Sequence, residues 1–415
     1  MKECKLRSVM MIFISSLFIM GSSCGKSNSS SGSDAVSNSE DSFLQASPTS
    51  LLSEPESDTA FSNGFIYYGY KNSLIEFDTE SGKTATISPK ISENTFLSCY
   101  SPYDGYIYAV KKVLDTTDNT ESYSIVRIDF NTSDMEEIYS PEDKADVIDC
   151  MTVSNDGRLF FSQGHFTGGN TDENGFNNDF YVYSYDIGSK KTGKLVCASS
   201  YYIYDDTIYF TRLNESSDTE RLFYAKISKP DDITDTKADV VANVSENTPY
   251  MYYPVDGKVY YSTNDNTLRC YDVAKGESSD VCTFDDDTYV RYFQKWNGKM
   301  IILLREHRKD SKWYQYGLYY LDKNNKPVKI LDEEYFNKDY PLGFEFIDFM
   351  TIFDGCDSGF IISNYNTRED RRVYLVDKDF KLTKVIETGG WDYKSYEEEQ
   401  QKIEELTQNY QDGGQ

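Results

Sequence analysis

The sequence is poor in the residues and motifs on which many enzymes rely. Its 415 residues include two histidines and three tryptophans. It contains no Gly-x-Ser-x-Gly elbow, no His-Glu-x-x-His zinc motif and no Gly-rich phosphate loop. The acidic runs at 115–121 and 284–288 lack the Asp-x-Asp-x-Asp-Gly order of a calcium loop. We therefore expect no cofactor and no metal and assign no catalytic residue. The sequence favours a role without catalysis.

Positive charge is also scarce. The chain has 42 Lys and Arg against 69 Asp and Glu, a formal net charge of −27 at pH 7. The negative electrostatic field of such a chain repels phosphate backbones and anionic headgroups. This argues against binding to nucleic acid and against direct binding to a lipid surface.

Long apolar runs are missing except at the beginning of the chain. Lys2, Lys5 and Arg7 precede the apolar run Ser8–Met20, and small residues follow up to Cys24. This layout is that of an export signal, and the run is short for a membrane span of about 20 residues. We therefore predict a signal peptide over 1–23 and an exported protein.

The residues around Cys24 refine this prediction. The stretch GSSCGKSNSSSGS, Gly21–Ser33, resembles the lipobox of bacterial lipoproteins, although Gly21 stands where that family usually has Leu, Val or Ile. The resemblance implies diacylation of Cys24 and an anchor on the extracytoplasmic face of the cell membrane. The alternative is a secreted protein in which Cys24 is a bystander. The Ser-rich segment 24–57 is expected to be a flexible tether with a reach of roughly 30 Å.

One sequence motif recurs from residue 58 onwards. The stretch YMYYPVDGKVYYSTN, Tyr250–Asn264, predicts a pair of short strands around an Asp-Gly turn, and similar motifs occur six more times. Their anchor residues are Gly64, Gly105, Gly157, Asp206, Gly257, Gly298 and Gly359, with a mean spacing of about 49 residues. Most repeats add a third run that ends in Asp and then a fourth run, as in LRCYD, Leu268–Asp272. Four strands per repeat predict the blade of a β-propeller.

The predicted fold is therefore all-β: a propeller of seven blades, each with four antiparallel strands, with six or eight blades as alternatives. The 36 tyrosines are expected to be mainly core, because both faces of each blade pack on its neighbours. Pro254 suits a first strand, whose free edge can lose one ladder donor. The motif resembles TolB-like and YWTD-type propellers, including bacterial lipoproteins. It lacks a strict Tyr-Trp-Thr-Asp, and YWTD propellers usually have six blades.

The domain boundaries follow from these patterns. The propeller is assigned to 58–390. In the segment 391–415, Tyr396, Ile403, Leu406 and Tyr410 recur with helical spacing, which predicts one amphipathic helix. This helix is expected to dock on the propeller, or alternatively to bind a partner.

Loop lengths indicate which face is elaborated. The turns between strands one and two are tight, whereas the connections between strands two and three are long at 111–122, 162–179, 211–220 and 305–316. The segment DEEYFNKDYPLGF, 332–344, between blades six and seven adds to the same face. Because loops on a rigid scaffold commonly bind ligands, this is the candidate binding face.

The candidate ligand-binding residues share these loops: Gln163, His165, Phe166, Arg212, Arg305, His307, Trp313 and Tyr314, with Phe176 and Arg308 nearby. The two histidines could share a metal or acid–base role, but blades three and six need not bring them together, and a solvated loop histidine is the alternative. Trp313 and Tyr314 could stack on a sugar or hold a peptide, or could pack on their own blade.

Six cysteines remain in the propeller: Cys99, Cys150, Cys197, Cys270, Cys282 and Cys356. None forms a Cys-x-x-Cys pair, and the hairpin register places Cys270 opposite Ser279 and not Cys282. Free buried thiols are the favoured interpretation, with disulfides as the alternative that export allows.

Taken together, the sequence predicts a monomeric, non-catalytic binding or scaffold propeller at the cell surface, with a protein or glycan ligand. The alternative is an extracytoplasmic carbohydrate-active hydrolase or lyase that uses carboxylates on the long-loop side.

Overall fold

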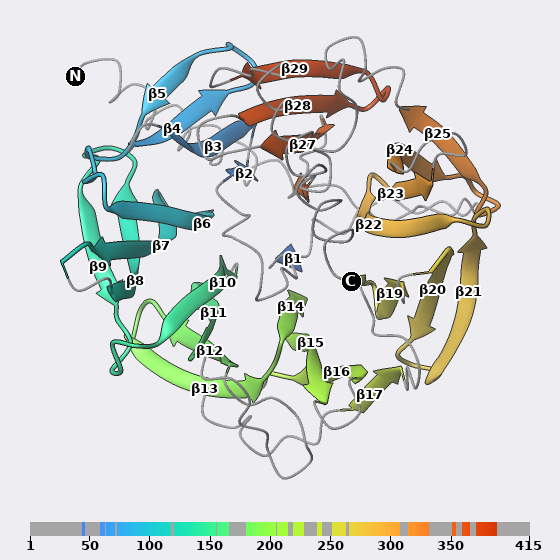
Figure 1. The fold of residues 1–415 in the computed structure, drawn as a ribbon, viewed down its shortest axis with the longest axis horizontal. Helices are drawn as coiled ribbons and strands as arrows, with labels where there is room; N and C mark the ends of the chain where they lie inside the picture. Colours follow the sequence, from blue (N-terminus) through green and yellow to red (C-terminus); the bar gives the residue numbers. More distant parts are fainter. Residues whose placement is uncertain are drawn as a thin grey trace, which may run out of the picture.

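The chain forms a closed ring of seven antiparallel sheets, six with four strands and one with five (Figure 1). In this computed structural model the described residues are 44–45, 59–62, 64–70, 73–117, 120–154, 156–165, 180–204, 206–214, 219–227, 239–242, 251–262, 265–307, 314–331, 351–353, 359–365 and 371–387. The seven-bladed all-β prediction is confirmed, and within the described residues no segment is helical. The helix predicted at 391–415 lies outside the described residues.

The strands of each blade follow one another in sequence. Blade 1 holds β2 (Thr59–Ser62), β3 (Phe65–Tyr70), β4 (Ser73–Asp78) and β5 (Thr84–Thr86). Blade 2 holds β6 (Thr95–Tyr103), β7 (Tyr106–Asp115), β8 (Thr120–Asp129) and β9 (Met135–Tyr139). Blade 3 holds β10 (Val147–Val153), β11 (Arg158–Gly164), β12 (Phe180–Asp186) and β13 (Lys191–Cys197).

The remaining blades repeat this order. Blade 4 holds β14 (Ser200–Tyr204), β15 (Thr207–Asn214), β16 (Thr219–Lys226) and β17 (Asp239–Ala242). Blade 5 holds β18 (Met251–Val255), β19 (Lys258–Ser262), β20 (Thr267–Asp272) and β21 (Glu277–Thr283). Blade 6 holds β22 (Thr288–Trp296), β23 (Lys299–His307), β24 (Tyr314–Leu321) and β25 (Pro327–Leu331). Blade 7 holds β26 (Thr351–Phe353), β27 (Gly359–Tyr365), β28 (Arg371–Asp377) and β29 (Leu382–Glu387). One further strand, β1 (Leu44–Gln45), pairs with β14.

The recurring turn lies where the sequence predicts it, between the first and second strands of each blade. In blade 5 it is formed by Asp256 and Gly257, both with positive φ (51° and 69°), as a tight hairpin turn requires. Gly359 has a different role as the first residue of β27, because a Cβ there would lie 2.3 Å from the carbonyl oxygen of Val376. We call the face that bears these turns the tight-turn face, and the opposite face, with the two-to-three and blade-to-blade connections, the long-loop face.

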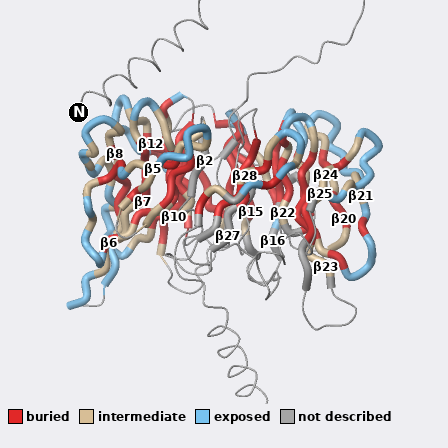
Figure 2. The backbone as a smooth tube through the Cα atoms, turned by 90° about the horizontal axis from the view of Figure 1, so that it is seen from above, coloured by how far each residue is buried: buried red, intermediate tan, exposed pale blue. Residues whose placement is uncertain are grey.

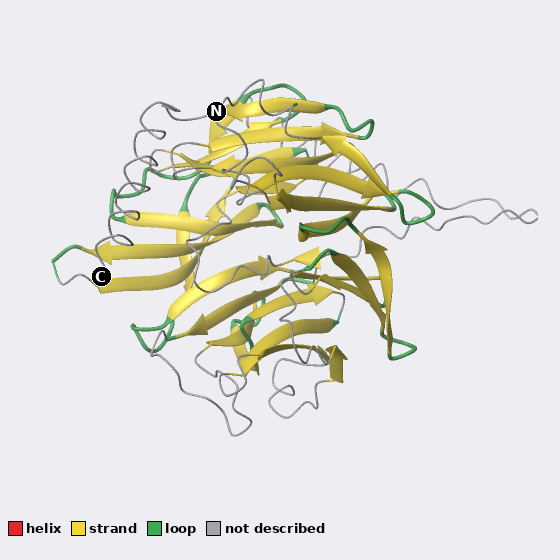
Figure 3. Cartoon of the chain, turned by 45° about the vertical axis from the view of Figure 1, so that its right-hand side comes forward, coloured by secondary structure: helices red, strands yellow, loops and turns green. Residues whose placement is uncertain are grey.

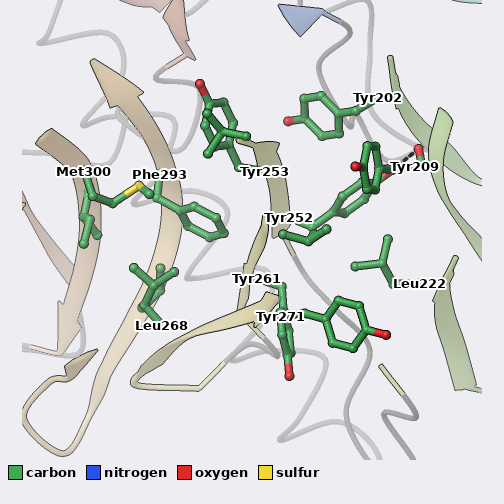
Figure 4. Close-up of a cluster of buried hydrophobic side chains, with 14 of the residues drawn as sticks. Tyr202, Tyr209, Leu222, Tyr252, Tyr253, Tyr261, Leu268, Tyr271, Phe293 and Met300 are labelled. Carbon is green, nitrogen blue, oxygen red and sulfur yellow. Dashed lines mark hydrogen bonds between the residues drawn. The ribbon is translucent and has the colours of Figure 1, made fainter. Parts of the chain in front are cut away.

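Tyrosine side chains fill the contacts between blades, as the sequence predicts. Figure 4 shows Tyr202 and Tyr209 from blade 4 beside Tyr252 from blade 5, and the Tyr202 and Tyr252 ring centroids are 5.0 Å apart. Their hydroxyl groups find polar partners, since Tyr252 Oη lies 3.2 Å from Ser200 Oγ. Buried backbone lies inside the blades and exposed backbone at the turns and the rim (Figure 2).

The long-loop prediction needs a correction in three blades. In blade 2, strands β7 and β8 extend to Asp115 and from Thr120, so most of 111–122 is a continued hairpin. In blade 4, strands β15 and β16 extend into segment 211–220. In blade 6, strands β23 and β24 extend into the two ends of segment 305–316. The residues of these segments are polar but compatible with β-structure, and they continue the strand pairing beyond the buried part of the sheet. Their polarity had led to the prediction of loops. In blade 3 the strands do end, at Gly164 and from Phe180.

The oblique view in Figure 3 shows short turns at the described strand ends, drawn in green. No helix among the described residues is long and apolar enough to cross a membrane. None of the five described cysteines, Cys99, Cys150, Cys197, Cys270 and Cys282, forms a disulfide. Cys270 pairs with Ser279 in register, as predicted.

Candidate functional site

A polar network links blades 2 and 3 on the long-loop face. It combines Tyr139 at the end of β9, Asp143 and Asp146 in the connection between the blades, and Gln163 and His165 at the end of β11. The connection is a tight turn: Asp143 Oδ1 accepts the Ala145 N–H (3.0 Å) and Asp143 O accepts the Asp146 N–H (3.1 Å). This turn directs both aspartates towards β11.

The inner part of the network is a chain of short hydrogen bonds. Tyr139 Oη donates to Gln163 Oε1 (2.6 Å), and Gln163 Nε2 donates to Asp146 Oδ2 (2.6 Å). Gln163 is only 6% exposed, so its amide needs these partners. Because a carboxylate only accepts, the NH₂ group of Gln163 must face Asp146, which sets the orientation of the amide.

The outer part of the network surrounds an imidazole with two carboxylates. His165 Nδ1 lies 2.5 Å from Asp146 Oδ1, and His165 Nε2 lies 3.3 Å from Asp143 Oδ2. The N–H direction at Nδ1 does not align with the carboxylate, so the contact is an ion pair when His165 is protonated and not a directional hydrogen bond. Exposure rises outwards, from 17% for the Asp146 side chain to 33% for His165 and 62% for Asp143. The network therefore leads from the core to solvent.

Aromatic residues support this network from below and beside it. The Tyr139 ring lies 4.9 Å from Phe161, which stacks on Tyr183 at 5.8 Å (centroid distances). On the rim, Lys194 Nζ lies 3.2 Å from the centroid of the Tyr181 ring. The site therefore offers aromatic faces as well as polar atoms.

Partial burial changes the acid–base properties of several groups at this junction. Burial raises the pKa of Tyr139 to about 12, helped by Tyr183 and Asp146 and opposed by its hydrogen bond with Gln163. Burial also lowers the pKa of Lys194, while the electrostatic interactions with Cys197 and Asp146 oppose this shift. Both shifts favour the neutral forms, as expected where water is partly excluded.

Arg212 lies in the neighbouring blade and has a structural partner. Its Nε donates to the carbonyl oxygen of Cys197 (2.7 Å), and its guanidinium lies over the Phe210 and Phe223 rings (5.1 and 5.7 Å). These contacts tie β15 to the end of blade 3. Arg212 therefore borders the candidate site and helps to join the two blades.

The predicted residues of blade 6 lie elsewhere. Arg305 pairs in register with Tyr289 and Tyr316, and His307 pairs with Tyr314. Strands β11 and β23 lie on opposite sides of the ring (Figure 1). The two histidine-bearing strands are therefore not neighbours. Phe166, Phe176, Arg308, Trp313 and Cys24 lie outside the described residues, as do the side chains of His307 and Tyr314.

Sequence reasoning missed three members of the network: Tyr139, Asp143 and Asp146. Their signal was local, because the connection SPEDKAD (140–146) places two aspartates three residues apart just before an inner strand. Among the described residues no three His, Cys, Asp or Glu side chains are grouped so as to hold a metal ion.

No protein-family model matches this chain, and no curated protein matches its sequence. Solved structures do resemble it. An acylaminoacyl peptidase in complex with Z-Gly-Gly-Phe-chloromethyl ketone has a TM-score of 0.51 at 14% identity, over 81% of this chain and 53% of that one. The β-propeller domain of the Trilobed protease from Pyrococcus furiosus has a TM-score of 0.45 at 10% identity, over 72% and 85%.

An oligogalacturonate lyase in complex with manganese is similarly distant, with a TM-score of 0.48 at 10% identity, over 78% of this chain and 84% of that one. The chain spans about half the length of the acylaminoacyl peptidase. At such identities the likeness concerns the fold alone.

Proposed function

We propose that this chain is an exported, lipid-anchored and monomeric propeller of the TolB-like type that binds a protein or glycan ligand at the cell surface without turning it over. The signal sequence and the lipobox-like stretch around Cys24 support the anchor. The observation that carries the binding role is the Tyr139–Gln163–Asp146–His165 network, which reaches solvent on the long-loop face.

The chemistry of the network narrows the choice of ligand. Asp143 and Asp146 offer carboxylate acceptors, and Tyr181 offers an aromatic face beside Lys194. Hydroxyl groups of a sugar, or the amino groups of a basic peptide, suit such acceptors, and sugar rings also stack on aromatic faces. An anionic ligand would meet two carboxylates and the negative field of the whole chain.

A hydrolase or lyase is the second candidate, and one observation favours it. Asp146 lies against Nδ1 of His165 while His165 remains one-third exposed. In a general acid–base pair a carboxylate orients one imidazole nitrogen and leaves the other to exchange a proton with a substrate. Here the imidazole of His165 would have to turn so that its Nδ1 N–H points at Asp146, because the two groups are close but not aligned. In this reading Asp143, near Nε2, would have to move aside when the substrate binds.

One experiment separates the two functions. The purified chain is applied to carbohydrate and peptide arrays, and both capture and product formation are measured. We expect capture without turnover, weakened about tenfold or more by Asp143→Asn, which removes one charge-assisted acceptor. Asp134→Asn is the matched control, since Asp134 is an exposed carboxylate in the turn between β8 and β9 on the tight-turn face.

The outcomes are distinct. Formation of product from any probe would show that the chain is an enzyme. Equal capture by the wild type and Asp143→Asn would show that the ligand does not bind at the junction of blades 2 and 3. The anchor is tested separately by mass spectrometry of the mature N-terminus in native membranes. An unmodified Cys24 there would contradict lipidation.

A further inference from the structure

The first strand of each blade is the innermost strand of its four-stranded sheet, and in blade 4 the additional strand β1 pairs with it. We call the side of a first strand that faces the centre of the ring its channel edge. The edge of a sheet can accept another strand through backbone N–H and C=O groups, and proteins usually blunt such an edge with bulges, prolines or short length. The inner strands of this ring differ in whether they carry such protection.

Most described inner strands are protected. The pairing of β6, β10 and β22 with their second strands shifts register at Ser98/Ser101, Asp149/Thr152 and Val290/Tyr292. At the first two shifts Cys99 and Cys150 adopt positive φ (54° and 49°), which breaks the edge. Strand β18 contains Pro254, which lacks an N–H. Strands β2 and β26 have only four and three residues.

Strand β14 has none of these features. Its sequence is SYYIY, without Gly, Pro or charge, and it pairs with β15 residue by residue from Ser200↔Thr211 to Tyr204↔Thr207. Both of its faces are buried: Tyr201 and Ile203 belong to the cluster shared with blade 3, and Tyr202 and Tyr204 to the cluster shared with blade 5. Its backbone is therefore held straight, with a regular edge towards the channel.

This edge is the one that carries an additional strand. β1 pairs with β14 antiparallel, with Leu44 opposite Tyr204 and Gln45 opposite Ile203, and the sheet of blade 4 has the order β1-β14-β15-β16-β17. Figure 1 shows β1 inside the ring beside β14. The segment that pairs here belongs to the region which composition alone assigns to a tether.

We propose that the channel edge of β14 is a strand-acceptor site, and that its resident ligand is the tether segment around Leu44 and Gln45 of the same chain. The main-chain ladder supplies the binding, as in other complexes where an extended peptide joins a sheet edge. The channel edges of the other described first strands are interrupted by a bulge or a proline, or are short. The segment therefore pairs with blade 4.

The direction of pairing has a consequence for the anchored protein. Strand β14 runs from the connection at 198–199, on the long-loop face, to the turn at 206 on the tight-turn face. Since β1 is antiparallel to it, β1 runs from the tight-turn face towards the long-loop face. This step rests on the proposed function: if Cys24 is lipidated, this direction of β1 favours an orientation in which the tight-turn face is turned to the membrane and the ligand-binding face away from it.

Hydrogen exchange on the full-length chain in solution tests the proposal. The double substitution Leu44→Pro/Gln45→Pro fixes φ and removes both N–H groups of β1, of which one can face β14 because successive N–H groups of a strand point to opposite sides, so it should release β14. Within residues 200–204, the amides that face β1 should then exchange at least about tenfold faster because they become open to water, whereas the amides bonded to β15 should not change. Leu51→Pro/Leu52→Pro is the matched control in the same tether, and exchange in β11 reports that the propeller remains folded.

A peptide in trans completes the test. A synthetic peptide of residues 40–49, added at millimolar concentration to the double-proline variant, should restore slow exchange in 200–204, and the same peptide carrying both prolines should not. Unchanged exchange in the double-proline variant, or no protection by the wild-type peptide, would overturn the proposal. Neither readout needs a membrane or the surface ligand, so failure here is distinct from failure of the proposed function.

Discussion

The aspartate that ends the third strand of most blades holds the turn that follows it. Its Oδ1 atom accepts backbone N–H groups two to four residues later, at distances of 2.5 to 3.2 Å. The six examples are Asp78, Asp129, Asp186, Asp272, Asp322 and Asp377. Backbone N–H groups of this kind are the main cause that lowers the pKa of Asp322. The pKa values of Asp186 and Asp272 are lowered first by hydrogen bonds from the side chains of Ser189 and Lys275 and further by the backbone N–H groups. The repeated carboxylate is therefore structural and contributes stability that is lost as pH falls.

For Asp149 we predict the opposite dependence of stability on pH. Burial raises its pKa, although the Cys150 N–H (2.8 Å) partly opposes the shift. Between the ordinary and the raised pKa the folded chain keeps a proton that the unfolded chain has lost, so the contribution of Asp149 to stability falls as pH rises. Asp149→Asn keeps the acceptor oxygen without the charge. We expect this variant to be more stable than the wild type at about pH 8, with the gain vanishing towards about pH 4.

Urea unfolding of both proteins across this pH range measures the difference in free energy. Asp186→Asn is the control of opposite sign: its pKa is lowered, so the substitution should cost stability at neutral pH and cost nothing in acid. A stability difference for Asp149→Asn that does not vary with pH would contradict burial of the charge.

Among the elements, the fourth strand of the blades carries a recurrent bulge. In blades 2 to 7 the pairing of the third with the fourth strand shifts register by one residue at an equivalent place. The extra residue is aliphatic each time: Ile138, Leu195, Val241, Val281, Ile330 and Val385. Five of these residues belong to, or pack against, hydrophobic clusters of the blades. The bulge turns an aliphatic side chain inward and adds twist at the rim.

Leu195 tests this interpretation, since it is the most buried of the five whose side chains are described, at 3% exposure. Leu195→Ala should lower the free energy of unfolding by about 2–4 kcal/mol because it leaves a cavity between blades 3 and 4. Leu195→Ile, which conserves volume, should cost less than about 1.5 kcal/mol. Urea unfolding measures both values. Equal losses for the two variants would show that volume is not the cause.

In the whole molecule, the ring closes through side chains and without a shared strand. Blade 1 and blade 7 each contain four strands that are consecutive in sequence. The contact between them is a hydrophobic cluster in which Ile66 and Tyr68 of blade 1 meet Ile361, Val373 and Ile386 of blade 7. Among the described strands no ladder joins blades 1 and 7, so their closure depends on contacts between side chains, with this cluster at the centre.

Ile361, with 0% exposure, is the residue to change. Ile361→Ala should lower the free energy of unfolding by about 2–5 kcal/mol. It should also accelerate hydrogen exchange in β2–β5 and β26–β29 before the blades on the far side of the ring, because no ladder ties these two blades together. Ile107→Ala, in the equivalent contact between blades 1 and 2, is the control, because the chain itself also connects those blades. Uniform acceleration around the ring in both variants would contradict a weak closure.

The sequence by itself determined the blade number, the turn positions and the register of individual hairpins such as Cys270 opposite Ser279. These features are local: turn residues, strand propensity and a period of about 49 residues all act within one blade. The same reasoning placed Gln163 and His165 correctly on the long-loop face. It treated extended hairpins as loops, because polar strand ends and polar loops have the same composition.

Only the tertiary structure decided which residues meet between blades. It joined His165 to Asp143 and Asp146 of the preceding connection, and it placed Arg305 on the other side of the ring. It also paired Leu44 with Tyr204, 160 positions apart in the chain. Such contacts depend on how blades stack and how the ring closes, and these are set by the summed packing of many side chains, which no local pattern in the sequence records.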